Sequence, residues 1–423
     1  MCRNFFLILR HLVLGIILPT ADTFSDINFA VSAFSTQNPR IGISMLFPII
    51  LNLAFNIYFW LVTKFDSQME RRFTWLLIIM NVWPQYQVLK LIVSIVRGKD
   101  NWKDRQNKIR RNLSYIEPFI EAVPQYFIAL GVFGMLVSRD AWEKYGIRIA
   151  EKGILNIVFQ DSTSIWQRKE DNKITEVFGK ETLGISNTIM FPLSLAVSFI
   201  TSIRSVTDYL QNGPIQISSE NKICNIFLLI AKTIYVSTEF INMIFFCIVF
   251  SNIRLDGAWI YLIVLTIHMM IPLLWVILPI TRYLGIKKSA ILFLGSPQLL
   301  MLPFITDFVF GPLNGYRRCN CCGSKCCCSI GCCFCWCCCC QTCKFEEGHE
   351  ITISKEMSTI KMIYSFCILI LFCIMTYFGH FGEGSAFHQL LITYFVLAGI
   401  GKICFVTILY AGKDFHVLKI DNS

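Results

Sequence analysis

The chain has 423 residues, of which 55% are hydrophobic and only 16% are charged, and its mean hydropathy is +0.56. This composition excludes an ordinary soluble domain, because the apolar residues fall in runs of about 20 residues, the length of a helix that crosses a bilayer. The formal net charge of +10 gives no support for nucleic-acid binding, since the basic residues cluster in short loops between the apolar runs. The sequence predicts an all-α, polytopic membrane protein.

Successive apolar segments run along the whole chain. They lie at approximately residues 5–34, 43–63, 73–96, 113–137, 187–210, 223–251, 258–281, 289–311, 360–379 and 387–411. A cleaved signal peptide is an alternative for the first of them. However, no small-residue cleavage site followed by a soluble domain is present, and apolar sequence resumes through Phe34. We therefore expect the first segment to be a membrane helix.

The third segment, 73–96, is expected to enter the membrane without crossing it. Basic residues flank both of its ends, most densely in the loop Arg97–Arg111, so both ends prefer the cytosol. Pro84 interrupts its middle, where a helix would break, and Gln85 follows. A re-entrant hairpin satisfies both observations, provided that protein rather than lipid shelters the broken backbone.

The eighth segment, 289–311, has the same pattern. Basic residues flank both of its ends, and Pro297 and Gln298 interrupt it. This second Pro-Gln pair follows the first by 213 residues, close to the distance between the starts of the first and sixth segments. A second re-entrant hairpin is therefore expected here, in a related half of the chain.

Two parallel pseudo-repeats, 1–210 and 211–423, account for this spacing. Each would hold four crossings and one Pro-Gln hairpin, which gives about eight transmembrane helices, two re-entrant hairpins and two cytosolic termini. The first half would carry an extracellular loop at 137–186, and the second half a cytosolic Cys-rich insert at 317–345. Ten simple crossings are the alternative, which would place the basic loop outside the cell.

The Cys-rich insert holds fourteen of the 20 cysteines, all between Cys319 and Cys343. Reducing cytosolic conditions argue against disulfides there. One interpretation is S-palmitoylation, because neighbouring basic residues would hold the cysteines at the inner leaflet. Zinc binding and a low-complexity insertion without function are alternatives, and overlapping pairs of cysteines define no single set of zinc ligands. The acylation candidates are Cys319, Cys321, Cys322 and Cys326.

No motif of a familiar enzyme is present in the sequence. It contains no Gly-rich phosphate loop, no GxSxG elbow and no HExxH, and no two of its six histidines stand at metal-ligand spacing. The sequence therefore predicts a protein that is not an enzyme, with no metal site and no cofactor.

Polar side chains inside the apolar segments give the strongest functional signal. A charge in hydrocarbon costs roughly 2.5–3.5 kcal/mol on insertion scales, so such groups normally face water or a partner. Several of them lie four residues apart and therefore share one helical face. The candidates for a lipid path are Asp22, Asp26, Glu117, Glu121, Gln125, Arg204, Asp208 and Glu239. The alternative is internal pairing, of Arg204 with Asp208 and of Lys232 with Glu239.

The stretch EPFIEAVPQYFIALGVF, Glu117–Phe133, resembles the glutamate-containing helix of the XK-related membrane proteins. The hairpin sequence WPQYQVLKL and the serine-rich helix SNTIMFPLSLAVSFITSIRSVTDY are similar to neighbouring segments of that family. The likeness covers most of 1–310 in layout and is specific over about 80–140 and 186–210. The long extracellular loop and the Cys-rich tract depart from the family pattern.

This resemblance implies a plasma-membrane phospholipid scramblase, which moves lipids such as phosphatidylserine between leaflets without ATP, in some relatives during apoptosis. It implies phospholipids as the substrate and a single-pass membrane protein or a lipid-transfer protein as a partner. The C-terminal tail GKDFHVLKIDNS has no Asp-x-x-Asp site, so caspase activation is not expected. Two alternatives stay open: a non-catalytic membrane scaffold, and an ion-coupled channel or transporter, for which intramembrane carboxylates are also typical.

Overall fold

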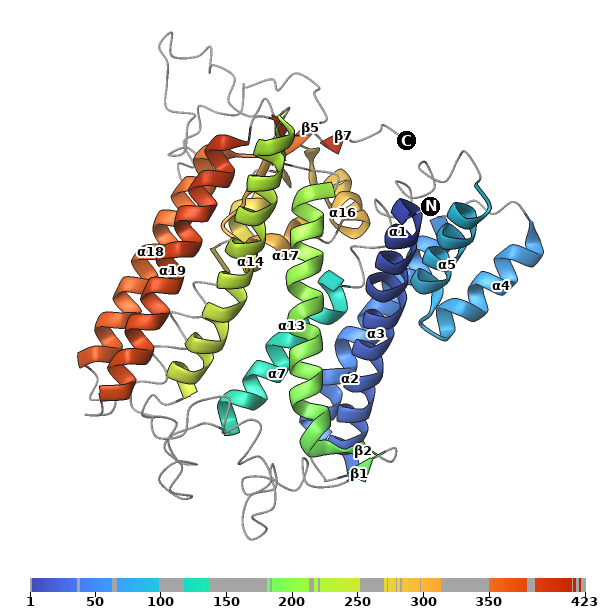
Figure 1. The fold of residues 1–423 in the computed structure, drawn as a ribbon, viewed down its shortest axis with the longest axis horizontal. Helices are drawn as coiled ribbons and strands as arrows, with labels where there is room; N and C mark the ends of the chain where they lie inside the picture. Colours follow the sequence, from blue (N-terminus) through green and yellow to red (C-terminus); the bar gives the residue numbers. More distant parts are fainter. Residues whose placement is uncertain are drawn as a thin grey trace. The chain divides into compact units, whose positions relative to one another are not determined.

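In the computed structural model, the residues that are described are mostly helical, with a few short strands (Figure 1). It describes residues 2–35, 39–62, 67–98, 118–136, 181–182, 185–212, 217–219, 221–251, 270–271, 273–278, 280–281, 284–296, 298–312, 350–378, 385–412, 414–415 and 418–419. The predicted all-α class is confirmed. The Cys-rich insert and nearly all of the predicted extracellular loop lie outside the described residues.

The chain divides into two compact units. The first comprises Met1–Ser205 and Phe246–Asn252, and the second comprises Val206–Phe245 and Ile253–Ser423. The division falls within helix α13 (Asn187–Asn212), near the boundary at residue 210 that the sequence suggested. That the two halves are repeats of one another stays a prediction.

The first unit consists of the helices that precede α13, most of α13 itself and the end of α14 (Lys222–Ser251). They are α1 (Cys2–Leu12), η1 (Val13–Ile17), α2 (Leu18–Ser35), α3 (Pro39–Val62), α4 (Gln68–Ile79), α5 (Trp83–Val96), η2 (Pro118–Ala122) and α7 (Val123–Leu136). The strands β1 (Glu181–Thr182) and β2 (Ile185–Ser186) pair antiparallel just before α13.

The second unit combines long helices with small antiparallel sheets. Its helices are α14 (Lys222–Ser251), α16 (Ile286–Gly295), α17 (Gln298–Ile305), α18 (Lys355–Phe378) and α19 (Ser385–Ala411). One sheet pairs β3 (Ile217–Ser218) with β6 (Asp414–Phe415), and the other has the order β4 (Phe310–Pro312), β5 (Glu350–Ile353) and β7 (Leu418–Lys419). These pairings bring the segment before α14 and the segment after α17 to the C-terminal end of the chain.

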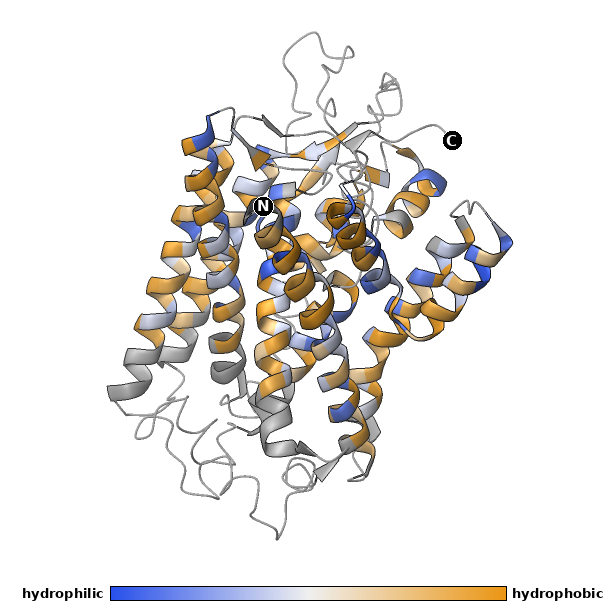
Figure 2. Ribbon diagram, turned by 45° about the vertical axis from the view of Figure 1, so that its right-hand side comes forward, coloured by the Kyte–Doolittle hydropathy of each residue, from blue (hydrophilic) through white to orange (hydrophobic). Residues whose placement is uncertain are grey.

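Three helices of the described residues are long and apolar enough to cross a membrane: Phe5–Val31, Lys222–Ile244 and Leu391–Ala411. A fourth candidate is the pair Ile286–Leu294 and Gln298–Ile305, whose bend of 74° fits either a broken span or a re-entrant loop. Hydrophobic residues, coloured orange, recur along all the long helices of the ribbon (Figure 2). The chain is thus a helical membrane protein, and its described residues hold three or four candidate spans, whereas the sequence predicted about eight crossings.

The segment predicted as the first hairpin folds into helices α4 and α5. The ring of Phe73 lies 5.4 Å from that of Tyr86, and Lys90 Nζ lies 3.1 Å from Glu70 Oε1, so the two helices run antiparallel. Helix α4 begins at Gln68, five residues earlier than predicted, because Ser67 caps it by accepting a hydrogen bond from the Glu70 amide. Hydropathy alone missed this polar first turn.

The sequence predicted that the helix breaks at Pro84, but the break lies three residues earlier, at Asn81. Pro84 lies in the first turn of α5, where its missing N–H leaves no helical hydrogen bond unmade. The chain reverses instead at Asn81, which has a φ of 54°. Asparagine tolerates this left-handed conformation better than most residues with a side chain. Gln85 is buried on α5, whereas Pro297 lies outside the described residues and Gln298 is buried at the start of α17.

Helices α14 and α19 approach each other closely at Gly401. A Cβ atom added to Gly401 would overlap Thr238 Oγ1 and lie 3.2 Å from Thr238 Cβ. A Cβ atom added to Gly399, two residues earlier on the same helix, would meet no other part of the described chain within 4 Å. These two glycines therefore separate the effect of crowding from the effect of helix propensity.

We expect Gly401→Ala to destabilise the second unit by about 1–3 kcal/mol, because the added methyl group forces α14 and α19 apart. The control Gly399→Ala is expected to be neutral or to stabilise by up to about 1 kcal/mol, since alanine favours the helix. Melting temperatures of the detergent-solubilised protein, read by fluorescence-detected size-exclusion chromatography, test both. Equal effects of the two substitutions would show that the helices do not touch at Gly401.

Candidate functional site

Three buried carboxylates come together in the first unit. Asp22 and Asp26 lie one turn apart on α2, and Glu121 lies in η2. Their side chains are 4%, 0% and 2% exposed, and each aspartate interacts electrostatically with Glu121. We call these three residues the acidic cluster.

Hydroxyl groups of α13 hold the two aspartates. Ser198 Oγ donates a hydrogen bond of 2.7 Å to Asp22 Oδ1, and Ser194 Oγ donates to Asp26 Oδ1. Both serines are buried, and their spacing of four residues matches that of the aspartates. One face of α2 therefore meets one face of α13 through two parallel hydroxyl–carboxylate contacts.

Glu121 binds side chains from two other helices. Thr23 Oγ1 donates a hydrogen bond of 2.9 Å to Glu121 Oε1, and Asn52 Nδ2 on α3 donates one of 2.5 Å to Glu121 Oε2. The turn that carries Glu121 is a π-helix bounded by Pro118, and Pro124 follows it without a backbone N–H to donate. Such π-helical turns widen a helix locally and are frequent at functional sites.

The turn of the first hairpin reaches this cluster. Asn52 Nδ2, which binds Glu121, also lies 3.4 Å from Asn81 Oδ1, and Asn56 Nδ2 lies 3.4 Å from Asn52 Oδ1. The residue with the left-handed backbone thus presents its amide to the partner of a buried glutamate. The hairpin and the acidic cluster are parts of one polar network.

The hydrogen-bond partners of the acidic cluster are all neutral among the described residues. Asp26 Oδ2 has no hydrogen-bond partner there, nor has either polar atom of Gln125, which lies one turn after Glu121 and is fully buried. No group of three or more His, Cys, Asp or Glu side chains in the described ranges has the arrangement of a metal site. The cluster is therefore acidic, uncompensated by a neighbouring cation in that part of the chain, and able to accept further hydrogen bonds.

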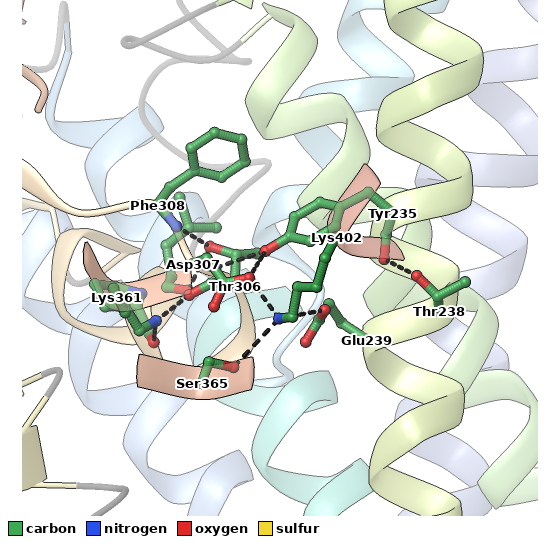
Figure 3. A network of polar contacts seen from close by, with 11 residues as sticks. Tyr235, Thr238, Glu239, Thr306, Asp307, Phe308, Lys361, Ser365 and Lys402 are labelled. Carbon is green, nitrogen blue, oxygen red and sulfur yellow. Dashed lines mark hydrogen bonds and ion pairs between the residues drawn. The ribbon is translucent and has the colours of Figure 1, made fainter. Parts of the chain in front are cut away.

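A second polar network, which we call the ion-pair network, lies in the second unit (Figure 3). Lys402 Nζ on α19 lies 3.0 Å from Glu239 Oε1 on α14, 2.5 Å from Asp307 Oδ2 and 3.2 Å from Ser365 Oγ on α18. The hydroxyl of Tyr235 donates to Asp307 Oδ2 at 3.2 Å and accepts from the Asp307 amide at 2.6 Å. One lysine thus joins three helices and the end of α17.

Lys361 on α18 completes this network at the end of α17. Its ammonium group donates to the backbone carbonyls of Pro303 and Thr306 at the C-terminal end of that helix, where a cation is favoured by the helix dipole. In contrast to the acidic cluster, the ion-pair network balances two carboxylates with two lysines. This arrangement is typical of internal pairing that holds helices together.

The proposed pairing of Lys232 with Glu239 is wrong. Lys232 Nζ donates to Gln211 Oε1 at 2.7 Å and to the Ile217 carbonyl at 2.6 Å, and Glu239 binds Lys402 instead. Spacing along one helix could not reveal a partner that lies 163 residues away.

The remaining candidate residues separate into two groups. Arg204 Nη1 donates to the Leu14 carbonyl at the π-helical turn η1, and Asp208 follows one turn later on α13 at a half-buried position. Glu117 and the four acylation candidates, Cys319, Cys321, Cys322 and Cys326, lie outside the described residues. The lipid-path candidates that the structure brings together are therefore Asp22, Asp26, Glu121 and Gln125.

The sequence reasoning missed the neutral partners of the acidic cluster. Asn52 and Asn56 stand four residues apart in the second apolar segment, and Ser194 and Ser198 do so in the fifth. Asp22 and Asp26 were identified by this same spacing. Neutral polar residues four apart within an apolar segment would therefore have predicted the partners of the cluster. Asn81 carried no such signal, because its contact depends on the turn geometry.

No protein-family model, curated protein or solved structure matches this chain.

Proposed function

We propose that the chain is a phospholipid scramblase, which lets lipids such as phosphatidylserine exchange between the leaflets of the plasma membrane without ATP. The acidic cluster is the observation that carries this proposal. Each of the three buried carboxylates has only neutral hydrogen-bond partners in the described part of the chain, where Asp26 Oδ2 and the side-chain amide of Gln125 have none. A bundle that needed only stability would gain by pairing these groups with cations, as the ion-pair network does.

The chemistry of the cluster suits a phospholipid headgroup. Choline, ethanolamine and serine headgroups each carry an amine cation, which three carboxylates attract. The phosphate of the same headgroup accepts hydrogen bonds, which hydroxyl and amide groups such as Ser194, Ser198 and Asn52 can donate. A headgroup that meets these partners loses less solvation free energy in hydrocarbon, while its acyl chains stay in lipid. Such a path speeds equilibration and creates no gradient.

Lipid exchange requires an opening of this structure. The carboxylates are exposed by no more than 4%, and the contacts of Ser198 with Asp22 and of Ser194 with Asp26 close the face between α2 and α13. A trigger or a single-pass membrane partner that separates these helices would expose the cluster to lipid. The proposed activity is therefore gated.

The proposed topology has about eight crossings, two re-entrant hairpins and both termini in the cytosol. The basic residues that flank 73–96 and 289–311 support it, because cytosolic loops carry an excess of Lys and Arg. The bend between α16 and α17 agrees with a re-entrant second hairpin.

Reconstitution in liposomes tests the proposal. The purified full chain is placed in vesicles that contain a fluorescent phospholipid, and dithionite then bleaches the outer leaflet. We expect bleaching to proceed well beyond the outer half of the fluorescence, once the protein is combined with its trigger or partner. Protein-free vesicles and vesicles with the heat-denatured protein are the controls. Failure of every activated form to exchange lipid would refute the proposal.

An ion-coupled channel or transporter is the second candidate, because carboxylates without a neighbouring cation also bind protons or metal cations during transport. Planar-bilayer recordings and proton-flux measurements on the same purified protein distinguish the two. A current or a proton flux in the absence of lipid exchange would favour the transporter.

A further inference from the structure

The α4–α5 hairpin is too short to cross a bilayer. With 12 and 14 residues at 1.5 Å per residue, α4 and α5 extend about 18 and 21 Å, whereas the hydrocarbon core is about 30 Å thick. Because the helices run antiparallel, residues 67–72 and 96–98 form the base of the hairpin, at the end opposite its turn at Asn81. If the hairpin enters a bilayer from its base, the base lies near the polar surface and the turn at Asn81 lies within the hydrocarbon depth.

Charge is confined to the base half of the hairpin. Between Ser67 and Gly98 the basic residues are Arg71, Arg72, Lys90 and Arg97 and the acidic residue is Glu70, so that 73–89 contains no charged side chain. Glu70 is paired with Lys90 at 3.1 Å. The three arginines are exposed, and neither Arg72 nor Arg97 forms an ion pair with any described residue. The base thus presents three positive charges that nothing described there neutralises.

The outer faces of both helices are apolar and uncovered. Met69, Phe73, Leu76 and Met80 follow one face of α4, and the side chains of Leu76 and Met80 are 52% and 61% exposed. Leu89, Val93 and Val96 follow one face of α5 in the same way. Exposed apolar faces of this length, in a membrane protein, indicate contact with acyl chains.

Two tryptophan rings lie beside Arg71 at the base of the hairpin. The ring of Trp60 on α3 lies 4.9 Å from that of Trp75, and the Arg71 guanidinium lies 4.7 Å from the Trp60 ring centroid. Trp60 Nε1 also donates to the Arg71 carbonyl at 3.2 Å. Tryptophan and arginine gather in this way at the headgroup level of membranes. Arg71 and Arg72 also follow the N-terminus of α4, where the helix dipole disfavours cations and favours an anion.

We propose that the hairpin enters a single leaflet and that Arg71, Arg72 and Arg97 at its base bind the headgroup of an anionic phospholipid. The apolar faces of α4 and α5 contact the acyl chains of the same leaflet. Under the proposed topology this is the cytosolic leaflet, which is rich in phosphatidylserine. The site holds lipid whether or not the chain exchanges lipid between leaflets, so it does not depend on the proposed scramblase activity.

Native mass spectrometry of the purified full chain tests this site directly. The protein is delipidated in detergent and titrated with phosphatidylserine or phosphatidylcholine of the same acyl chains. We expect tighter retention of phosphatidylserine, and Arg72→Gln with Arg97→Gln is expected to weaken it at least about tenfold. Lys222→Gln with Lys287→Gln, which removes the same charge from exposed positions of the second unit, is expected to leave retention unchanged.

Three outcomes would overturn the proposal. The first is equal retention of the two lipids by the unsubstituted chain. The second is an unchanged preference for phosphatidylserine in the Arg72 and Arg97 variant. The third is displacement of the lipid by soluble glycerophosphoserine at equal concentration, which would indicate a site for free anions instead. In addition, a photoreactive amino acid at Leu76 is expected to crosslink to acyl chains in nanodiscs, and crosslinking to a second polypeptide alone would contradict single-leaflet insertion.

Discussion

Lys402→Met is expected to destabilise the second unit by about 3–5 kcal/mol, the effect of removing one partner from a buried ion pair. Lys402 is the one group in contact with both Glu239 and Asp307 among the described residues, at 3.0 and 2.5 Å. Without it, Glu239 and Asp307 keep only the electrostatic interaction with Lys361 among the described cations, and α19 loses the contacts of Lys402 with Glu239 on α14 and Ser365 on α18. Expressed as a melting temperature in detergent, this corresponds to a decrease of about 10 °C.

Two further variants separate charge from packing in this prediction. Lys222→Met removes an exposed lysine from α14 and is expected to leave the melting temperature unchanged. Lys402→Met combined with Glu239→Gln and Asp307→Asn removes Lys402 and both carboxylates, and leaves Lys361 bound to the Pro303 and Thr306 carbonyls. It is expected to recover part of the lost stability, because no buried carboxylate is left without a cation. If the triple variant were as unstable as Lys402→Met, the lysine would act through packing, and the ion-pair network would not hold the helices together.

The class of the fold follows directly from the sequence, and its polar contacts do not. Runs of apolar residues identify membrane helices because the bilayer fixes their length. The basic residues on both sides of segment 73–96, together with Pro84 in its middle, predicted a hairpin there. Helices α4 and α5 occupy that segment. The reversal at Asn81 depends on a single left-handed residue, which hydropathy does not report.

The candidate site shows the same limit. The spacing of Asp22 and Asp26 placed both side chains on one face, and that face is buried against α13. Their serine partners lie 176 and 168 residues further along the chain. Spacing within one helix predicts which residues share a face, but contacts between helices depend on tertiary packing. For this reason the pairing of Lys232 with Glu239 was wrong, although both side chains do bind polar partners.

The two polar networks are expected to respond in opposite ways to loss of charge. Neutralising one residue of the ion-pair network leaves an oppositely charged buried group without its partner, which lowers stability. Neutralising a residue of the acidic cluster instead removes repulsion between carboxylates whose hydrogen-bond partners are neutral. Stability and transport can therefore be measured as independent effects, one in each unit of the chain.

Asp26→Asn with Glu121→Gln is expected to slow lipid exchange at least tenfold while the protein folds normally. A unit negative charge about 4 Å from an amine cation contributes about 1 kcal/mol in water and about 4 kcal/mol at an effective dielectric constant of 20. Removing two such charges weakens the attraction for a headgroup by at least about 2 kcal/mol, which exceeds a tenfold change. The dithionite assay on the activated, reconstituted protein measures the rate.

The amide side chains keep the hydrogen bonds of the cluster, so the melting temperature is expected to stay unchanged or to rise. The oxygen of the introduced glutamine can accept from Thr23. Asn52 can accept from the new NH₂ group if Asn56 and Asn81, which contact Asn52, turn their amides with it. Glu356→Gln, the same chemical change at an exposed position of α18, serves as the matched control and is expected to affect neither quantity. A variant that folds poorly and yet exchanges lipid at the original rate would identify the acidic cluster as part of a scaffold. Full exchange with normal stability would place the headgroup path elsewhere in the chain.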